Sequence, residues 1–167
     1  MAEVTTRTAG KLRRLAAKAD SGLRVGLILS GKLISQRATR KAPRATGRLK
    51  RSIHEGKPYN TGRTAMAIDV GTDVEYAAAQ EFGSGIHAER GPKEPIRIYP
   101  VKKQALAFEW PDAPAGLTPS KTGKYVFASV SHPGVKAQPY LRPALNESVG
   151  DIRKLILKSV AGALRRP

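Results

Sequence analysis

The sequence contains no cysteine and few aromatic residues. Without Cys, neither a disulfide framework nor a cysteine-based zinc site can form. Aromatic residues make up 5% of the chain, too few for the stacking platforms of single-strand nucleic-acid binders. No apolar run approaches the roughly 20 residues of a membrane helix, and no continuous apolar segment suggests a signal peptide. We therefore expect neither a disulfide scaffold nor a membrane protein.

Motifs of the common enzyme classes are also missing. The chain has no phosphate-binding glycine loop of the Walker or GxGxxG type and no GxSxG nucleophile motif. His54, His87 and His132 lie far apart, and none has a second ligand three or four residues away. Glu75 and Glu81 are six residues apart and do not mark a catalytic pair, and Glu81 is better explained by capping or by pairing with an arginine. We expect a protein that is not an enzyme and that uses no metal or cofactor.

Positive charge is abundant, with a formal net charge of +17. Residues 1–53 hold 14 Lys and Arg against 2 Asp and Glu, residues 54–140 hold 10 against 9, and residues 141–167 hold 6 against 2. Basic ends favour an anionic partner, either DNA or an acidic protein surface, although solvated helix faces would give the same composition. The densest group is the candidate DNA- or partner-facing surface: Arg37, Arg40, Lys41, Arg44, Arg48, Lys50 and Arg51.

Both ends of the chain have helical periodicity. Apolar residues recur every three or four positions in a basic helical region over 7–41, in which Gly22 is expected to mark a break. Pro43 ends that region, because the residue before a proline is disfavoured in a helix. A second apolar stripe predicts a C-terminal helix over 142–165, with Pro143 in its first turn.

The segment between these helices predicts a small β-meander. Alternating patterns predict four strands, over 64–70, 96–100, 105–110 and 125–131. A loop rich in Pro and Gly makes a hairpin of the last two. The segment over 74–82 is ambiguous; its alanine content favours a short helix, which Gly83 would end. The chain is predicted to be one α+β domain over 1–167. Its sheet region, 60–135, would hold about four mostly antiparallel strands with the C-terminal helix packed on the sheet.

Three short blocks place Pro or Gly corners next to apolar anchors and contain no catalytic group. The first runs from Ala42 to Ile53, the second joins Tyr76-Ala77 to residues 81–84, and the third covers 139–145. In the second block, the two aromatic residues are spaced like core contacts. The candidate structural residues of the blocks are Pro43, Thr46, Gly47, Leu49, Ser52, Tyr76, Glu81, Phe82, Gly83, Pro139, Leu141 and Pro143.

In residue pattern and in order along the chain, the three blocks resemble those of a family of minor tail, neck and tail-completion proteins of long-tailed bacteriophages. Residues 42–53 match its Ala-Pro-x-x-Thr-Gly-x-Leu-x-x-Ser-Ile run. The second block matches a Tyr-Ala segment leading to Glu-Phe-Gly-Thr, with Ser84 in place of Thr, and 139–145 match Pro-aromatic-Leu-x-Pro-Ala-Leu. The resemblance spans about residues 10–160 in order, with an unusually long loop around 84–95.

The resemblance implies a non-enzymatic virion protein of the neck or tail, assembled in the host cytoplasm. Copies would form a homo-oligomeric ring, expected to be a hexamer, at the head–tail junction. The ring would join the connector or head-closure protein to the tail-tube or tail-terminator protein around the DNA channel, with non-specific contact to packaged DNA. The charge alone leaves open a free-standing, sequence-independent DNA-binding protein. A third interpretation is a toxin–antitoxin protein or a small hydrolase, but the sequence has no nucleophile motif and no group of metal ligands to support it.

Overall fold

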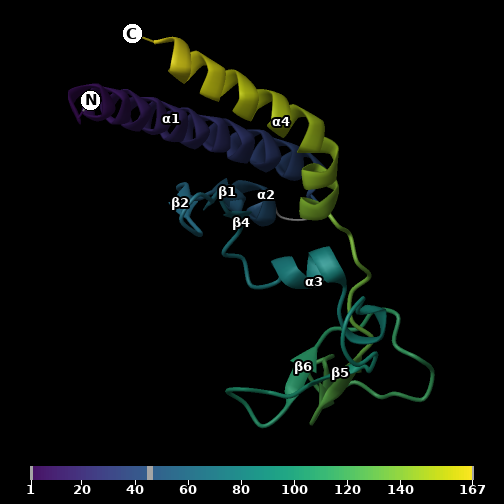
Figure 1. Cartoon of the computed structure of the whole chain (residues 1–167). Coiled ribbons are helices and arrows are strands. Elements are labelled where there is room, and N and C mark those ends of the chain that lie inside the picture. Colours follow the sequence, from purple (N-terminus) through teal and green to yellow (C-terminus); the bar gives the residue numbers. More distant parts are fainter. Residues whose placement is uncertain (1, 45–46, 167) are drawn as a thin grey trace. The chain divides into compact units, whose positions relative to one another are not determined.

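The computed structural model describes residues 2–44 and 47–166, which form helices joined by short strands and loops (Figure 1). The predicted α+β class is confirmed. The helices are α1 (Ala2–Lys41), α2 (Arg48–Ser52), α3 (Ala77–Phe82) and α4 (Leu141–Arg165), with a 3-10 turn at Gly85–His87. Among the described residues, no helix is long and apolar enough to cross a membrane.

The chain divides into two compact units. The first unit combines residues 1–77 with 138–167, and the second unit comprises residues 78–137. The prediction that 1–167 act as one domain therefore stays a prediction, and the two units are described separately. Because both ends of the chain belong to the first unit, the second unit is an insertion within it.

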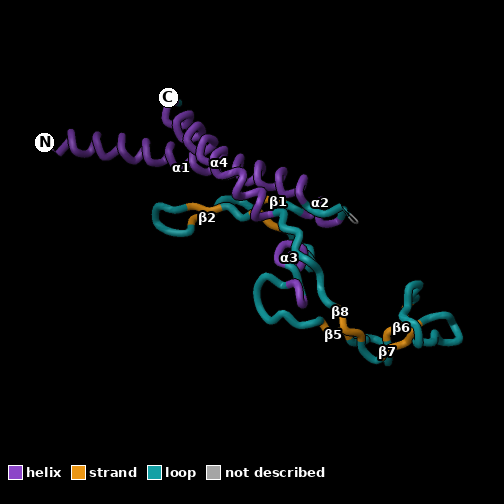
Figure 2. The backbone as a smooth tube through the Cα atoms, turned by 90° about the vertical axis from the view of Figure 1, so that its right-hand side faces the viewer, coloured by secondary structure: helices purple, strands orange, loops and turns teal. Residues whose placement is uncertain are grey.

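The first unit is built on a pair of long helices, α1 and α4, that pack side by side in opposite directions (Figures 1 and 2). The predicted break at Gly22 is wrong, since α1 continues through it. A Cβ at Gly22 would lie 2.7 Å from the Cα of Val160, and a Cβ at Gly26 would lie 2.8 Å from the Cα of Ile156. These glycines therefore serve close approach of two backbones and do not interrupt the helix.

Small side chains continue this contact along α1. Residues four apart form a ridge on a helix surface, and such ridges fit the grooves of a partner helix. The buried ridge of α1 consists of Gly22, Gly26, Ser30, Ile34 and Ala38, and the buried Ala42 continues the same spacing just after the helix ends. The prediction that the C-terminal helix packs on a sheet is thus wrong in its detail. The apolar stripe of α4 meets this ridge, because the strands of the first unit are two residues long and offer no sheet face.

The strands of the first unit form one irregular hairpin against α1. They are β1 (His54–Glu55), β2 (Tyr59–Asn60), β3 (Met66–Ala67) and β4 (Val70–Gly71), with β1 pairing β4 and β2 pairing β3. His54 faces Gly71, whereas Tyr59 faces Ala67, so the register shifts by one residue between the two pairs. This shift is a bulge at Lys57-Pro58, where proline cannot donate a ladder hydrogen bond. The strand predicted over 64–70 is therefore split in two.

The second unit holds two further antiparallel pairs (Figure 2). Its strands are β5 (Ile96–Ile98), β6 (Leu106–Phe108), β7 (Tyr125–Phe127) and β8 (Val130–His132). The predicted hairpin is confirmed by the pairing of β6 with β7, whereas the strand predicted over 125–131 divides, since β8 turns away to pair with β5. One sheet of about four strands is thus replaced by two-stranded sheets, because each short strand pairs with one other among the described residues.

A backbone crossing ties the start of the second unit to its end. The Ser84 amide donates to the Val135 carbonyl at 2.9 Å, and the Ile86 amide donates to the Pro133 carbonyl at 2.9 Å. The Val135 amide donates in turn to the Ser84 hydroxyl at 3.0 Å. Gly83 ends α3 with a φ of 74°, as predicted, and Gly134 crosses the Ser84 backbone with a φ of 97°.

Candidate functional site

The first and third sequence blocks meet in the core of the first unit. After α1, the chain turns at Gly47, whose φ of 71° suits glycine, and enters α2, where Leu49 is 3% exposed. Tyr140, at the start of α4, is fully buried in the same cluster as Leu49 and Ala144. Pro143 lies in the first turn of α4, as predicted. The predicted turn residue Thr46 lies outside the described residues.

A polar contact holds the end of the first block. The Ser52 hydroxyl lies 2.8 Å from the Leu49 carbonyl oxygen, to which it donates, and 2.5 Å from the Thr72 hydroxyl. Thr72 Oγ1 accepts a hydrogen bond from the Val74 amide at 3.2 Å. Since Val74 belongs to the core cluster, Ser52 links α2 to the segment that leads into α3. No pattern in the sequence predicted α2 or the burial of Val74.

The second block contributes differently from the prediction. Ala77 is buried in the core cluster of the first unit, whereas Tyr76 is 40% exposed. Phe82 is 37% exposed, so the expected core role of both aromatic residues is wrong. Glu81 is 3% exposed in α3. Ala77 fits the crowded core because it lacks the ring that Tyr76 carries outward.

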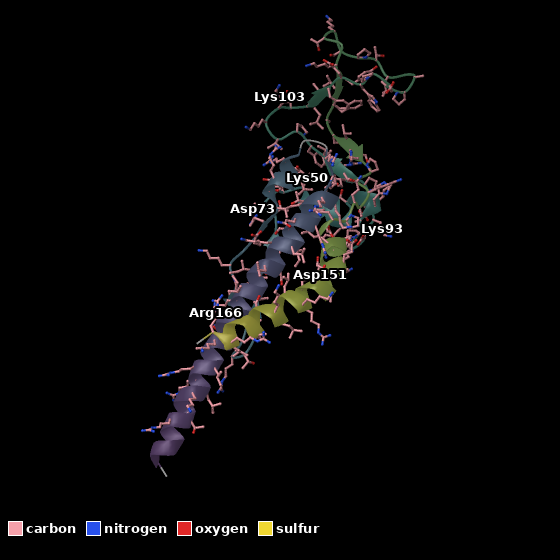
Figure 3. The ribbon with its side chains drawn as sticks, turned by 90° about the horizontal axis from the view of Figure 1, so that it is seen from above. Lys50, Asp73, Lys93, Lys103, Asp151 and Arg166 are labelled. Atoms are coloured by element: carbon pink, nitrogen blue, oxygen red, sulfur yellow. The ribbon has the colours of Figure 1, made fainter. Side chains whose placement is uncertain are left out.

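The predicted basic cluster does not form one free surface. Arg37 and Lys41 turn toward α4, while Arg40, Arg44, Arg48 and Arg51 are exposed and Lys50 is half-buried. Lys41 Nζ lies 2.7 Å from Glu147 Oε1. These residues therefore divide into two that join helices and five that lie near the surface. Figure 3 labels Lys50 of the second group and Asp151, the ion-pair partner of Arg37. The role of the exposed ones in binding stays a prediction.

Arg37 makes the most extensive of these contacts. Its guanidinium donates to Asp151 Oδ2 at 2.5 Å, to the Ser148 hydroxyl at 2.9 Å and to the Glu147 carbonyl oxygen at 2.8 Å. In the ion pair, the Arg37 side chain is 27% exposed and the Asp151 side chain is 45% exposed, so solvent partly screens the attraction between their charges. The planar guanidinium group of arginine can donate hydrogen bonds to several acceptors at once. Arg37 therefore acts as a clamp that joins α1 to α4.

We expect Arg37→Gln to lower the free energy of unfolding by about 1–2 kcal/mol, because several hydrogen bonds to a charged group are lost together. The matched control is Arg40→Gln, which removes the same charge from an exposed position of α1 and should change stability by less than about 0.5 kcal/mol. Urea unfolding followed by circular dichroism measures both. Equal losses in the two variants would contradict the clamp.

A second set of cations was left unassigned by the sequence reasoning. Arg7, Lys11, Arg14 and Lys18 are spaced by four, three and four residues along the start of α1. This spacing places them on one side of a helix, and it could have been read from the sequence, because the helical region predicted over 7–41 already includes these four positions. Among residues 2–44 and 47–166, no group of three His, Asp or Glu side chains could hold a metal ion.

Comparison with known proteins agrees with the resemblance found in the sequence. Residues 6–83 match the family model HK97-gp10_like, described as "Bacteriophage HK97-gp10, putative tail-component". The match includes the first block and the second block as far as Gly83, and it confirms the predicted likeness over that part; the family is one of structural tail components and not of enzymes. Neither a search of curated proteins nor a search of solved structures returned a match.

Proposed function

We propose that this chain, a bacteriophage tail component of the HK97 gp10 kind, forms an oligomeric ring at the head–tail junction. The ring joins the connector or head-closure protein to the tail-tube or tail-terminator protein around the DNA channel, and a hexamer is the expected stoichiometry. The observation that carries this proposal is the incomplete burial of the second unit.

The second unit has almost no interior of its own. Among residues 78–137, all of which the structure describes, Glu81 is the one residue that is buried. Large apolar side chains are exposed on its strands and loops: Ile96, Ile98, Tyr99, Val101, Trp110, Leu117 and Val126. A two-stranded sheet is marginally stable alone, and each such sheet leaves two unpaired edges. Contact with other subunits would cover both the apolar side chains and the edges.

Ring assembly follows from the kind of contact that such a unit offers. An open strand edge and an apolar patch on one copy fit a different surface of the next copy, which makes the contact heterologous. Heterologous contacts close into rings when the rotation between copies divides a full turn. A tail component that surrounds a DNA channel requires this closed arrangement.

Particles provide the direct test. Phage lacking this protein should accumulate filled heads and separate tails in electron micrographs, whereas normal virions would refute the joining role. A free protein that shifts DNA in a salt-dependent manner, with no virion partner in pull-downs, would favour the alternative of a sequence-independent DNA-binding protein.

A pair of substitutions tests which face assembles. Val126→Lys places a charge on exposed β7 of the second unit, at a residue 52% exposed, and should abolish ring assembly. Val149→Lys makes the same change on α4 of the first unit, at a residue 59% exposed, and should leave assembly intact. Particle micrographs and mass photometry report both. Loss of assembly in Val149→Lys alone would place the contact elsewhere.

A further inference from the structure

The start of α1 carries a row of cations along one side. Arg7, Lys11, Arg14 and Lys18 follow one another at four, three and four residues. With a rise of 1.5 Å per residue, the row extends over about 16 Å of helix. Residues 7–19 contain no Asp or Glu. The row is therefore uniformly positive along its whole length.

Basic residues at the end of α4 extend the positive charge of this row. Lys18 Nζ donates to the Arg166 carbonyl oxygen at 2.6 Å, which brings the end of α4 beside the row. Lys158 and Arg166 line a groove of about 330 Å³ between the two helices, with Val25 and Leu29 of α1 on its wall. Figure 3 labels Arg166 there and shows the first turns of α1 continuing past it. Residues 152–166, at the end of α4 and just beyond it, include five Lys and Arg and no Asp or Glu.

Three basic residues further along α1 have carboxylate partners. Arg24 lies 3.1 Å from Asp20, and Arg37 and Lys41 pair with acidic residues of α4. Like charges three or four residues apart repel one another in a helix. Residues 7–19 supply no carboxylate to offset this repulsion. A polyanion outside the chain would reduce the repulsion among Lys11, Arg14 and Lys18.

We infer that this surface binds the phosphate backbone of double-stranded DNA. The surface, here called the hairpin cation surface, consists of Arg7, Lys11, Arg14, Lys18, Lys158 and Arg166. The inference rests on the proposed function, since it assigns this surface to the wall of the DNA channel. It differs from the interpretation based on sequence alone, which assigned the anion-facing role to the residues around Pro43.

Duplex DNA fits the arrangement better than a single strand does. A duplex presents one phosphate charge per roughly 1.7 Å of its axis, so about 16 Å carries roughly nine charges. No Phe, Tyr or Trp occurs in residues 1–53 or 141–167, so no ring of these helices can stack on an unpaired base. Contact with phosphates alone gives binding without sequence preference.

The test is duplex binding by the full chain, measured by fluorescence anisotropy between about 50 and 200 mM salt. Four to six phosphate contacts predict a slope of about −4 to −5 for log K against log salt. The double variant Lys11→Gln, Arg14→Gln should reduce that slope by about 2 and weaken binding at least about tenfold at the lower salt. Glutamine keeps the helix, and circular dichroism checks it.

The matched control is Arg40→Gln with Arg51→Gln, which removes the same net charge from the exposed corner around Pro43. It should lower the slope by less than the first pair does. Equal loss in both pairs, or greater loss in the control, overturns the assignment. Absence of duplex binding at the lower salt, or equally tight binding to polyglutamate, overturns the DNA partner in favour of an acidic protein.

Particle assays separate this inference from the proposed function. If heads and tails stay apart without the protein but the full chain does not bind duplex, the joining role stands and the DNA surface is refuted. If virions form normally without the protein, the proposed function fails irrespective of the duplex measurements. The expected result is that both assays are positive and that Lys11→Gln, Arg14→Gln rings still assemble.

Discussion

Gly26→Leu is expected to separate α1 from α4 and to lower the free energy of unfolding by about 3 kcal/mol or more. A Cβ at this position already lies 2.8 Å from the Cα of Ile156, and a leucine adds a branched side chain to that overlap. The Ile156 backbone cannot give way without moving α4. Thermal unfolding followed by circular dichroism should show a large drop in the midpoint.

Alanine substitutions separate the overlap from helix propensity. Alanine favours a helix over glycine by about 1 kcal/mol, so Gly150→Ala should stabilise the protein, since a Cβ at Gly150 meets nothing within 4 Å. Gly26→Ala gains the same propensity but should still destabilise, because its Cβ meets a backbone atom. If Gly26→Ala and Gly150→Ala were both stabilising, the helices would not be in close contact.

Gly134→Ala is expected to open the backbone crossing of the second unit. Its φ of 97° is unfavourable for alanine, and its Cβ would overlap the carbonyl oxygen of Ser84. Three hydrogen bonds of the crossing would be strained or lost, at about 1 kcal/mol each. Hydrogen exchange at the amides of Ser84, Ile86 and Val135 should therefore become faster. The free energy of protection at these amides should fall by about 3 kcal/mol in addition to the cost of placing an alanine at a positive φ.

Gly116→Ala is the matched control for this substitution. Gly116 has the same φ of 97°, but a Cβ there meets nothing within 4 Å. Both variants share the cost of an alanine in this conformation, about 1–2 kcal/mol. Gly116→Ala should leave exchange at the crossing unchanged, because it lies in the loop between β6 and β7. Similar exchange in both variants would show that the crossing does not depend on the glycine.

Helices at both ends and the β6–β7 hairpin were predictable because periodicity and turn residues are local signals. Gly22 shows where such signals fail. From the sequence alone, a glycine that allows two helices to approach closely cannot be told from a glycine that breaks a helix. At Gly22 the difference is the backbone of Val160, which lies more than 130 residues away in the chain. The division of 125–131 into two strands also depends on a distant partner, β5.

The candidate site was predictable in outline only. The Pro and Gly corners located the first and third blocks, and the family match agrees with the first two. The sequence could not separate Arg37, which clamps α4, from Arg40, which is exposed, because that difference depends on which side of α1 faces Asp151. The burial of Ala77 in place of Tyr76 likewise follows from the space that the core leaves.

The core built from both chain ends sets an order of events during synthesis. Ala38 and Ala42 are covered by Tyr140 and Ala144, about a hundred residues later, so a growing chain cannot close this core before α4 has left the ribosome. Until then the α1 ridge remains open to water and to other nascent chains. The residues of the family match, 6–83, therefore hold only one side of the core. Emergence of α4 from the ribosome is therefore the step that lets a subunit close its core.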